Sequence, residues 1–352
     1  MYFVYLVILF LALITLFLDV TWSNKRFLVL SWFGLFVVLG TFGYFTDDYE
    51  PYEEVVETSY LNPLAYVSIE PLWGWLANYV HGEIDKFRFI AFSFIAALLW
   101  FIVRAFKTNE KYFVVYYTLF CLQAHLCWIR QPLAMCVCLL GILLLCKMRF
   151  IFGIVFIILS LFVHKSAIMF IALLPFCMMP VNKKNVLLYL ILMPFLSILF
   201  YAILNSSSTY SSILYLQWYA EKEGEFDSRH IIFQFISLFS VLCQFLFLIY
   251  TVYRFYNNNN RYIVILIRYL LGIVLIAFFL FLLPLDTNVI YNRLLAFGMF
   301  IMTLIWSKNM QRSLIKRRYV FWLILLLLFV SVREIGMMGN NYTRVERLLK
   351  LP

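Results

Sequence analysis

The sequence predicts an all-α, polytopic membrane protein with about 12 transmembrane helices. Three observations lead to this fold class. Hydrophobic residues make up 65% of the 352-residue chain and charged residues only 13%, whereas a soluble domain carries about 25% charged residues. Apolar runs recur along the whole chain, and basic residues are concentrated in alternate connections between these runs. This composition excludes a soluble enzyme, a nucleic-acid-binding module and a disordered tail.

The candidate spans follow from the length of the apolar runs. A helix needs roughly 17–25 apolar residues to cross about 30 Å of hydrocarbon. The first run has no basic segment before it and no small-residue cleavage site after it, so we expect a retained span and not a signal peptide. The predicted spans lie at roughly 2–18, 27–43, 89–103, 112–129, 132–146, 150–164, 166–180, 186–204, 230–252, 262–283, 294–306 and 319–335.

The basic residues predict the orientation of the chain. Cytoplasmic loops of membrane proteins carry an excess of Lys and Arg. The connections that carry this excess contain Lys25, Arg26, Arg104, Lys107, Lys111, Lys147, Arg149, Lys183, Lys184, Arg254, Arg261, Lys308, Arg312 and Lys316 to Arg318. Both termini are therefore expected outside the cytoplasm, and the net charge of +10 serves topology and not a nucleic-acid partner. Residues 1–352 form a single membrane domain in this interpretation, with outer loops at 44–88, 205–229 and 284–293 and an outer tail at 336–352.

The acidic residues and a short aromatic segment indicate that the chemistry takes place on the outer face. All acidic residues except Asp19 and Glu110 fall on the predicted outer side. The segment from Leu72 to Val80 is too short to cross the bilayer. Its Trp73, Trp75 and Tyr79 suit the headgroup boundary, so we expect a re-entrant or interfacial helix near 72–80.

The first outer loop combines carboxylates with aromatic rings. Carboxylates accept hydrogen bonds from sugar hydroxyls, and aromatic rings can stack on the apolar faces of sugars. A solvated acidic loop that only hydrates the outer face is the alternative. The residues concerned are Asp47, Asp48, Tyr49, Tyr52, Glu70 and Trp73. In loop 205–229, Trp218 and its neighbouring tyrosines form either a glycan-binding cap or an interfacial segment without a ligand.

Three arginines stand where outward-facing helices are expected to begin. Arg130 is followed by Pro132, which fits the first turn of a helix because its missing N–H has no partner there. Unpaired N–H groups and the helix dipole favour anions at this end of a helix, and an adjacent guanidinium adds a bidentate hydrogen-bond donor. Arg229 and Arg293 occupy similar positions. The alternative is an arginine that only anchors the helix at the interface.

His164 and Lys165 lie between two apolar runs that are short for membrane-spanning helices. A run of about 15 residues covers only about 22 Å, less than the hydrocarbon thickness. Arg130, His164 and Lys165 are therefore expected below the outer surface, where ionisable groups are usually functional. His164 could act as a general base or donate to a phosphate oxygen. A locally thinned bilayer with His164 as a turn residue is the alternative.

The order of these outer motifs resembles the EpsG family, multi-span proteins of exopolysaccharide assembly related to Wzy-type O-antigen polymerases. Over roughly residues 1–180, the resemblance is carried by Thr46 to Tyr49 with Tyr52, Glu70 to Leu72, Arg130 with Ala134, and His164 with Ser166 and Ala167. Family members usually carry an Arg shortly before the Thr-Asp-Tyr stretch. Gly43, Tyr44 and Phe45 stand there in this chain, so any phosphate role of that Arg is absent or met elsewhere. Leu72 replaces the usual Gly after Glu-Pro.

The resemblance implies a GT-C-like glycosyltransferase in the bacterial cytoplasmic (inner) membrane, with its active site facing the periplasm or cell exterior. Donor and acceptor would be oligosaccharides linked to polyprenyl pyrophosphate, polymerised into O-antigen or exopolysaccharide without a cofactor. Membrane lipids and a chain-length regulator would be further partners. Arg130, Arg293, Arg229 and Lys165 would hold the pyrophosphate, and His164, Asp47, Asp48 or Glu70 would move the proton. The sequence contains no GxGxxG, P-loop, HExxH or CxxC motif, so nucleotide- and metal-dependent chemistry lacks support.

Other functions share part of this pattern. An O-antigen ligase, or a membrane glycosyltransferase that uses a monosaccharide lipid, would show nearly the same features. A flippase for lipid-linked oligosaccharides should line a central cavity with charges at mid-membrane depth, yet Arg268 is the main mid-span charge. A membrane acyltransferase usually meets its donor on the cytoplasmic side, where the sequence places no His.

Overall fold

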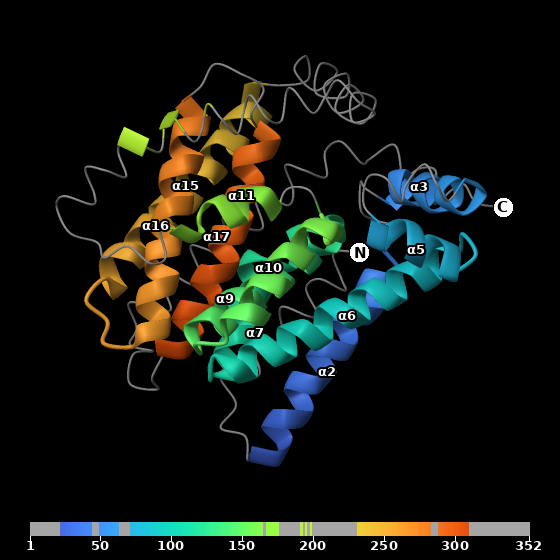
Figure 1. Ribbon diagram of the computed structural model, residues 1–352, viewed down its shortest axis with the longest axis horizontal. Helices are drawn as coiled ribbons and strands as arrows, with labels where there is room; N and C mark the ends of the chain where they lie inside the picture. The colour runs from blue at the N-terminus through green and yellow to red at the C-terminus, as the bar shows by residue number, and fades with distance from the viewer. Residues whose placement is uncertain are drawn as a thin grey trace. The chain divides into compact units, whose positions relative to one another are not determined.

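The part of the chain that the structure describes is entirely helical. The computed structural model describes residues 22–43, 49–62, 71–164, 167–175, 231–282 and 288–309, with short pieces between 191 and 198. No strand occurs in these residues, which confirms the all-α prediction for them. The helices, shown in Figure 1, are α2 (Trp22–Thr41), α3 (Tyr49–Leu61), α5 (Pro71–Tyr79), α6 (Ile84–Ala105), α7 (Glu110–Phe120), α8 (Leu122–Cys127), α9 (Arg130–Cys146), α10 (Phe150–Val163), α11 (Ala167–Ala172), α15 (Ile231–Phe255), α16 (Arg261–Leu282) and α17 (Asn288–Asn309).

The chain divides into two compact units. The first contains residues 1–172 and 300–314, and the second contains residues 173–299 and 315–352. In the first unit α2 packs on α6, α6 packs on α9, and α9 pairs with α10. In the second unit α15 and α16 form a helical hairpin, against which Gly298 of α17 fits closely. Helix α17 begins in the second unit and ends in the first.

The α9–α10 hairpin is held together by close backbone contact. A Cβ on Gly141 would lie 2.5 Å from Cγ1 of Ile157 and 2.8 Å from the carbonyl oxygen of Gly153. Small residues at helix interfaces allow this approach, which membrane helices commonly use. Because the two helices run antiparallel, the start of α9 and the end of α10 lie at the same end of the hairpin. Arg130 and His164 mark that end.

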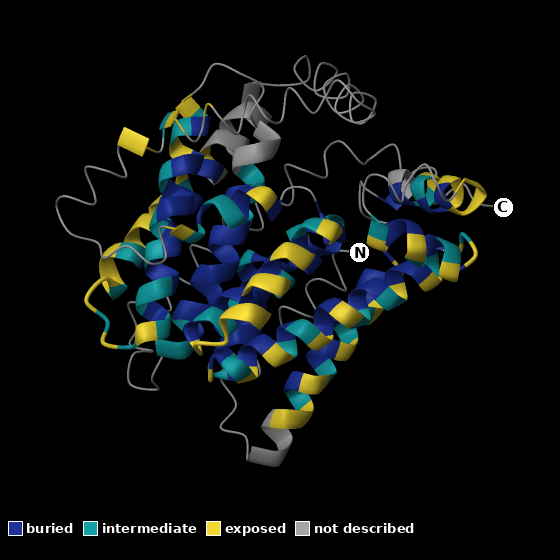
Figure 2. Cartoon of the chain, in the orientation of Figure 1, coloured by how far each residue is buried: buried dark blue, intermediate teal, exposed yellow. Residues whose placement is uncertain are grey.

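The outward faces of several helices are apolar, as a lipid-facing surface requires. On α10, Ile151, Phe152 and Ile154 are exposed, whereas Gly153 and Ile157 of the same helix are buried. Figure 2 shows similar alternation of buried and exposed residues along α2 and α6. A water-soluble surface would not carry so much continuous apolar area. These faces therefore favour a bilayer environment.

Two described helices are long and apolar enough to cross a bilayer, Ile84–Ala105 and Arg261–Leu282. The shorter apolar helices are Arg26–Thr41, Arg130–Cys146, Phe150–Val163 and Val241–Phe255. Each of these helices coincides with a predicted span. The predicted spans at 2–18 and 319–335 lie outside the described residues. The total of about 12 spans and the GT-C likeness remain predictions.

The two ends of α6 carry different groups of residues. At its C-terminal end Arg104 pairs with Glu110 at 3.1 Å, and Nζ of Lys308 donates to the carbonyl oxygen of Phe106 at 2.6 Å. All of these residues except Phe106 were predicted from sequence to share the cytoplasmic side. Arg88, near the N-terminal end, is the last residue of the predicted outer loop 44–88.

The observed helices differ from the predicted elements at two places. The acidic loop 44–88 contains α3, a helix that was not predicted there. Tyr49, Tyr52 and Val56 are buried along one face of α3, while Glu54 and Glu57 point outward, so the helix is amphipathic despite its acidic composition. In addition, the predicted span 112–129 is interrupted at Cys121, between α7 and α8. The hydroxyl of Tyr117 meets Nδ1 of His125 at 2.6 Å across this interruption.

Candidate functional site

Arg130 is the first residue of α9, as the sequence analysis expected. Its side chain is buried, and Pro132 lies in the same first turn. The Nε–H of Arg130 donates to the hydroxyl oxygen of Tyr52 at 3.3 Å, and the guanidinium carbon lies 5.3 Å from the centre of the Tyr52 ring. The N-cap residue, Ile129, makes no side-chain hydrogen bond to the N–H groups of this helix end. The helix start and the guanidinium therefore both favour an anion here.

The α3 helix brings a second arginine into the same neighbourhood. The guanidinium carbon of Arg88, on α6, lies 5.3 Å from the centre of the Tyr49 ring. Tyr49 and Tyr52 are three positions apart on α3 and share its buried face. The hydroxyl of Tyr49 donates to Oδ1 of Asp85 at 3.2 Å. We define the cationic cluster as Arg88, Arg130, Tyr49 and Tyr52.

Arg88 was not among the predicted site residues, although a signal was present. Its side chain is 0% exposed. Arg88 falls in the helical stripe that α6 buries, between Phe87 and Ala91, where only apolar residues are expected. An arginine inside an apolar stripe near a predicted membrane boundary indicates a role other than topology. From sequence, Arg88 falls at the end of the predicted outer loop 44–88, with no role assigned to it.

The end of α2 makes room for Arg88. The Nε–H of Arg88 donates to the carbonyl oxygen of Gly40 at 2.7 Å, and Nη2 lies 3.4 Å from the carbonyl oxygen of Leu126. A Cβ at position 43 would overlap Nη2 of Arg88, and a Cβ at position 40 would overlap the Phe92 ring. Gly43 belongs to the stretch of residues 43–45, within which the resemblance leads us to expect an Arg in related chains. In this chain the guanidinium of Arg88 lies beside it.

Trp73 of α5 contacts the residue before Arg88 and the residue before His164. Its Nε1–H donates to the carbonyl oxygen of Val163 at 2.5 Å, and its ring lies 5.4 Å from that of Phe87. His164 is the buried C-cap of α10, with extended backbone, and its carbonyl oxygen accepts from the N–H of Ala167 at 2.9 Å. Helices α3, α6 and α5 therefore lie between Arg130 and Val163, the residue that precedes His164.

The aromatic residues proposed for glycan stacking have different surroundings from those expected. Tyr49, Tyr52 and Trp73 are buried inside the first unit and do not line an open loop. On α5, Trp75 is 66% exposed and Tyr79 is 76% exposed. Helix α5 confirms the short helix predicted near 72–80, and its exposed rings suit an interface.

The remaining predicted site residues divide into two groups. Asp47, Asp48, Glu70, Lys165, Arg229 and Trp218 lie outside the described residues. Arg293 is half-buried and belongs to the second unit. Helix α17 begins at Asn288, so Arg293 lies beyond the first turn. The expected support from free N–H groups at the helix start does not reach Arg293, because only the first four are unpaired.

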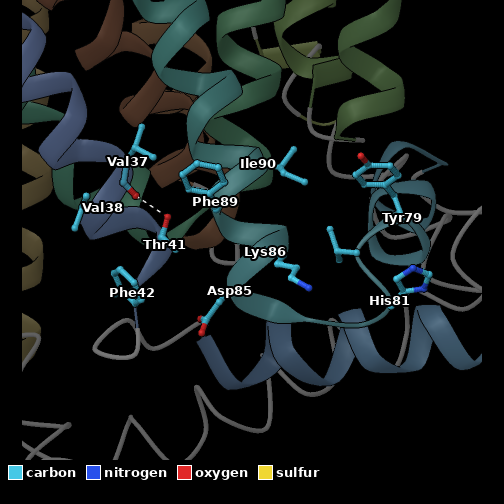
Figure 3. Close-up of a pocket in the computed structure, with 11 residues that line it drawn as sticks. Val37, Val38, Thr41, Phe42, Tyr79, His81, Asp85, Lys86, Phe89 and Ile90 are labelled. Carbon is cyan, nitrogen blue, oxygen red and sulfur yellow. Dashed lines mark hydrogen bonds between the residues drawn. The ribbon is translucent and has the colours of Figure 1, made fainter.

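An apolar groove of about 650 Å³ opens at the N-terminal end of α6 (Figure 3). Its walls are the end of α2, with Val38 and Phe42, and the first turns of α6, with Phe89 and Ile90. Tyr79, His81, Asp85 and Lys86 also line it. Asp85 therefore contacts both the groove and Tyr49. Within the described residues, no group of three His, Cys, Asp or Glu side chains is placed to hold a metal ion.

Comparison with known families decides the classification. The model of the EpsG family matches residues 25–343. The chain belongs to the EpsG family. The resemblance inferred from the outer motifs is thereby confirmed, and the match extends well beyond residue 180. No curated protein and no solved structure matches the chain. EpsG membership and the apolar helices together indicate a membrane protein of the polysaccharide-polymerase type.

Proposed function

We propose that this EpsG-family protein polymerises lipid-linked oligosaccharide repeat units at the outer leaflet of the bacterial cytoplasmic membrane. The growing glycan leaves its polyprenyl pyrophosphate carrier and joins a sugar hydroxyl of the next lipid-linked unit. Family membership supports the polymerase class. The single structural observation that carries the mechanism is the buried guanidinium of Arg130 at the start of α9, held by Tyr52.

The chemistry requires stabilisation of a leaving anion. The bond between the anomeric carbon and the pyrophosphate oxygen breaks, and its electron pair leaves with the lipid pyrophosphate. A new bond forms between the anomeric carbon and the acceptor oxygen, and the hydroxyl proton passes to a base. Fixed donors in a site shielded from water stabilise such developing charge strongly. Arg130 and the first N–H groups of α9 would do so, with Arg293, Arg229 and Lys165 as further candidates.

We assign the proton transfer to His164 or to an acidic residue of the predicted outer loop 44–88. His164 is positioned by the end of α10 and lies next to the Val163 carbonyl that Trp73 binds. An imidazole can accept the proton of the acceptor hydroxyl or protonate a phosphate oxygen. Asp47, Asp48 or Glu70 would orient the acceptor or serve as the base in place of His164. Trp218 would stack on the glycan.

The groove between α2 and α6 supports a place for the isoprenoid chain of the carrier. Its lining is mainly apolar, and Arg88 lies on the same turns of α6 as Phe89 and Ile90. A polyprenyl pyrophosphate has an apolar tail directly joined to a charged head. The groove, with Arg88 on the same turns of α6, matches that order of properties.

Chain-length analysis in a deletion strain tests this function. Complementation with the wild-type gene should restore long chains, whereas Arg130→Ala and His164→Ala should leave single repeat units. Arg149→Ala, an exposed arginine at the other end of the α9–α10 hairpin, is the control and should restore long chains. Wild-type chain lengths from Arg130→Ala and His164→Ala would remove both residues from the mechanism.

The deletion phenotype separates the alternatives. Loss of long chains with one capped unit retained indicates a polymerase. Long chains that stay on the lipid carrier indicate a ligase. Loss of all surface glycan, with lipid-linked units trapped inside the cell, indicates a flippase.

A further inference from the structure

Arg88 is a buried cation whose hydrogen bonds are incomplete. Its side chain is 0% exposed, and its Nε and Nη2 atoms face the carbonyl oxygens of Gly40 and Leu126. Nη1 is buried and has no hydrogen-bond partner among the residues that the structure describes. The ion pairs of the described residues do not include Arg88. A buried charge in this condition is strongly unfavourable unless a partner compensates it.

The described neighbours of Arg88 supply only part of that compensation. Tyr49 and Phe92 present ring faces to the guanidinium at 5.3 and 5.5 Å. The carboxylate closest in sequence, Asp85, accepts instead from the hydroxyl of Tyr49. Ring faces stabilise a cation by less than the cost of burying it. The position thus favours an anion that the described residues around it do not provide.

Arg88 and Arg130 approach the same face of α3. Arg88 contacts Tyr49, and Arg130 contacts Tyr52 one helical turn further along. Arg88 also reaches Leu126, at the end of α8, shortly before the chain enters α9 at Arg130. Two guanidinium groups held at neighbouring turns match a ligand with two linked anionic groups.

We propose that Arg88 binds the diphosphate of the lipid-linked substrate through Nη1, together with Arg130. This inference rests on the proposed function and names a second residue that grips the leaving group. Arg88 lies beneath Tyr49, so the ligand reaches Nη1 only after the Tyr49 contacts shift. The two carbonyl contacts fix the orientation of the guanidinium before the ligand arrives.

A purely structural role for Arg88 is the competing explanation. In that case Arg88 would only tie the end of α2 to the end of α8. Its replacement would then lower stability without changing the response of the protein to an anion. The measurement must therefore separate the stability of the protein from the increase in stability that a ligand produces.

Thermal unfolding of the purified full-length protein in detergent makes this separation. The probes are inorganic pyrophosphate and geranylgeranyl pyrophosphate, titrated against wild type, Arg88→Gln, Arg130→Gln and the exposed control Arg149→Gln. Loss of one charge-assisted contact should weaken the apparent affinity of Arg88→Gln for both probes by about 10- to 100-fold. Arg149→Gln should match wild type. Should Arg88→Gln fail to fold, Arg88→Lys replaces it in the experiment. Lysine keeps the positive charge but lacks the planar guanidinium with its paired N–H donors, so the same loss of affinity is expected.

The outcomes separate this inference from the proposed function. If Arg130→Gln loses the probe response while Arg88→Gln and Arg88→Lys keep it, Arg88 is structural and the proposed function stands. If wild type responds to neither probe, the pyrophosphate site itself is refuted. A further arm compares phosphatidylcholine vesicles with and without phosphatidylglycerol. An Arg88-dependent response to phosphatidylglycerol, with none to either diphosphate, would assign the residue to a membrane lipid and overturn the inference.

Discussion

The guanidinium of Arg88 occupies the space that a side chain at position 43 would need. Nη2 of Arg88 is the atom that a Cβ on Gly43 would meet first. The glycine is therefore explained by a close approach between the end of α2 and the first turns of α6. This relationship makes the position of the guanidinium open to experiment without changing the arginine itself.

Gly43→Ala should displace Arg88. The added methyl group overlaps the guanidinium, so we expect a loss of about 1–3 kcal/mol in the free energy of unfolding and shorter polysaccharide chains. Gly34→Ala is the matched control, because nothing lies within 4 Å of a Cβ at that position of α2. There the change should be neutral or stabilise the helix by about 0.5–1 kcal/mol. Chemical denaturation and chain-length gels measure both effects, and equal behaviour of the two variants would contradict the close approach.

A double variant extends this test. If the overlap is the cause, Gly43→Ala should cost less in an Arg88→Gln background, because the shorter side chain leaves room for the methyl group. The coupling between the two changes should be about 0.5–3 kcal/mol, as for residues in contact. Strict additivity of the two losses would argue against direct contact between these positions.

Trp73→Phe should loosen the end of α10. The change keeps an aromatic ring beside Phe87 but removes the Nε1–H that donates to the Val163 carbonyl. We expect a loss of about 1–3 kcal/mol in stability, because a buried acceptor is left unpaired. Polymerisation should also slow, since the neighbouring His164 is no longer fixed. Trp75→Phe, at an exposed position of the same helix, should stay within about 0.5 kcal/mol of wild type.

Ile90→Trp should fill part of the groove between α2 and α6. If the isoprenoid chain lies there, the apparent KM for lipid-linked substrate should rise while the thermal stability changes little. Ile151→Trp places the same bulky side chain on the exposed face of α10, outside the groove. The control should leave KM unchanged. An unchanged KM in Ile90→Trp as well would exclude the groove as the binding site of the carrier.

Arg130→Lys should lower the turnover number more than the stability. Lysine retains the positive charge but loses the planar fork and the Nε–H that binds Tyr52. Removal of one donor from a preorganised anion site typically reduces kcat by about 100- to 1000-fold. Arg149→Lys, at an exposed position, should be indistinguishable from wild type. In vitro polymerisation in proteoliposomes provides the rates. A wild-type rate from Arg130→Lys would show that the planar guanidinium is dispensable.

Much of the architecture could be predicted because hydropathy and charge act within each segment. The apolar runs at 132–146 and 150–164 predicted α9 and α10, and the alternation of loops placed Arg130 and His164 on the same, outer side. The helix within the acidic loop 44–88 was harder to predict. Its Glu residues obscured the buried stripe of Tyr49, Tyr52 and Val56, which only packing against the first unit reveals as the inner face of α3.

The sequence by itself determined the all-helical class and the family, and it predicted an anion site at Arg130, since each depends on local composition or on motifs that can be read in order. Only the tertiary structure decided that Arg88 is a buried member of the cationic cluster. Its hydrogen-bond acceptors, Gly40 and Leu126, lie 48 and 38 positions away along the chain. Contacts at such separations arise from how α2, α6 and α8 pack together, and no local pattern encodes which carbonyl groups will face a given side chain.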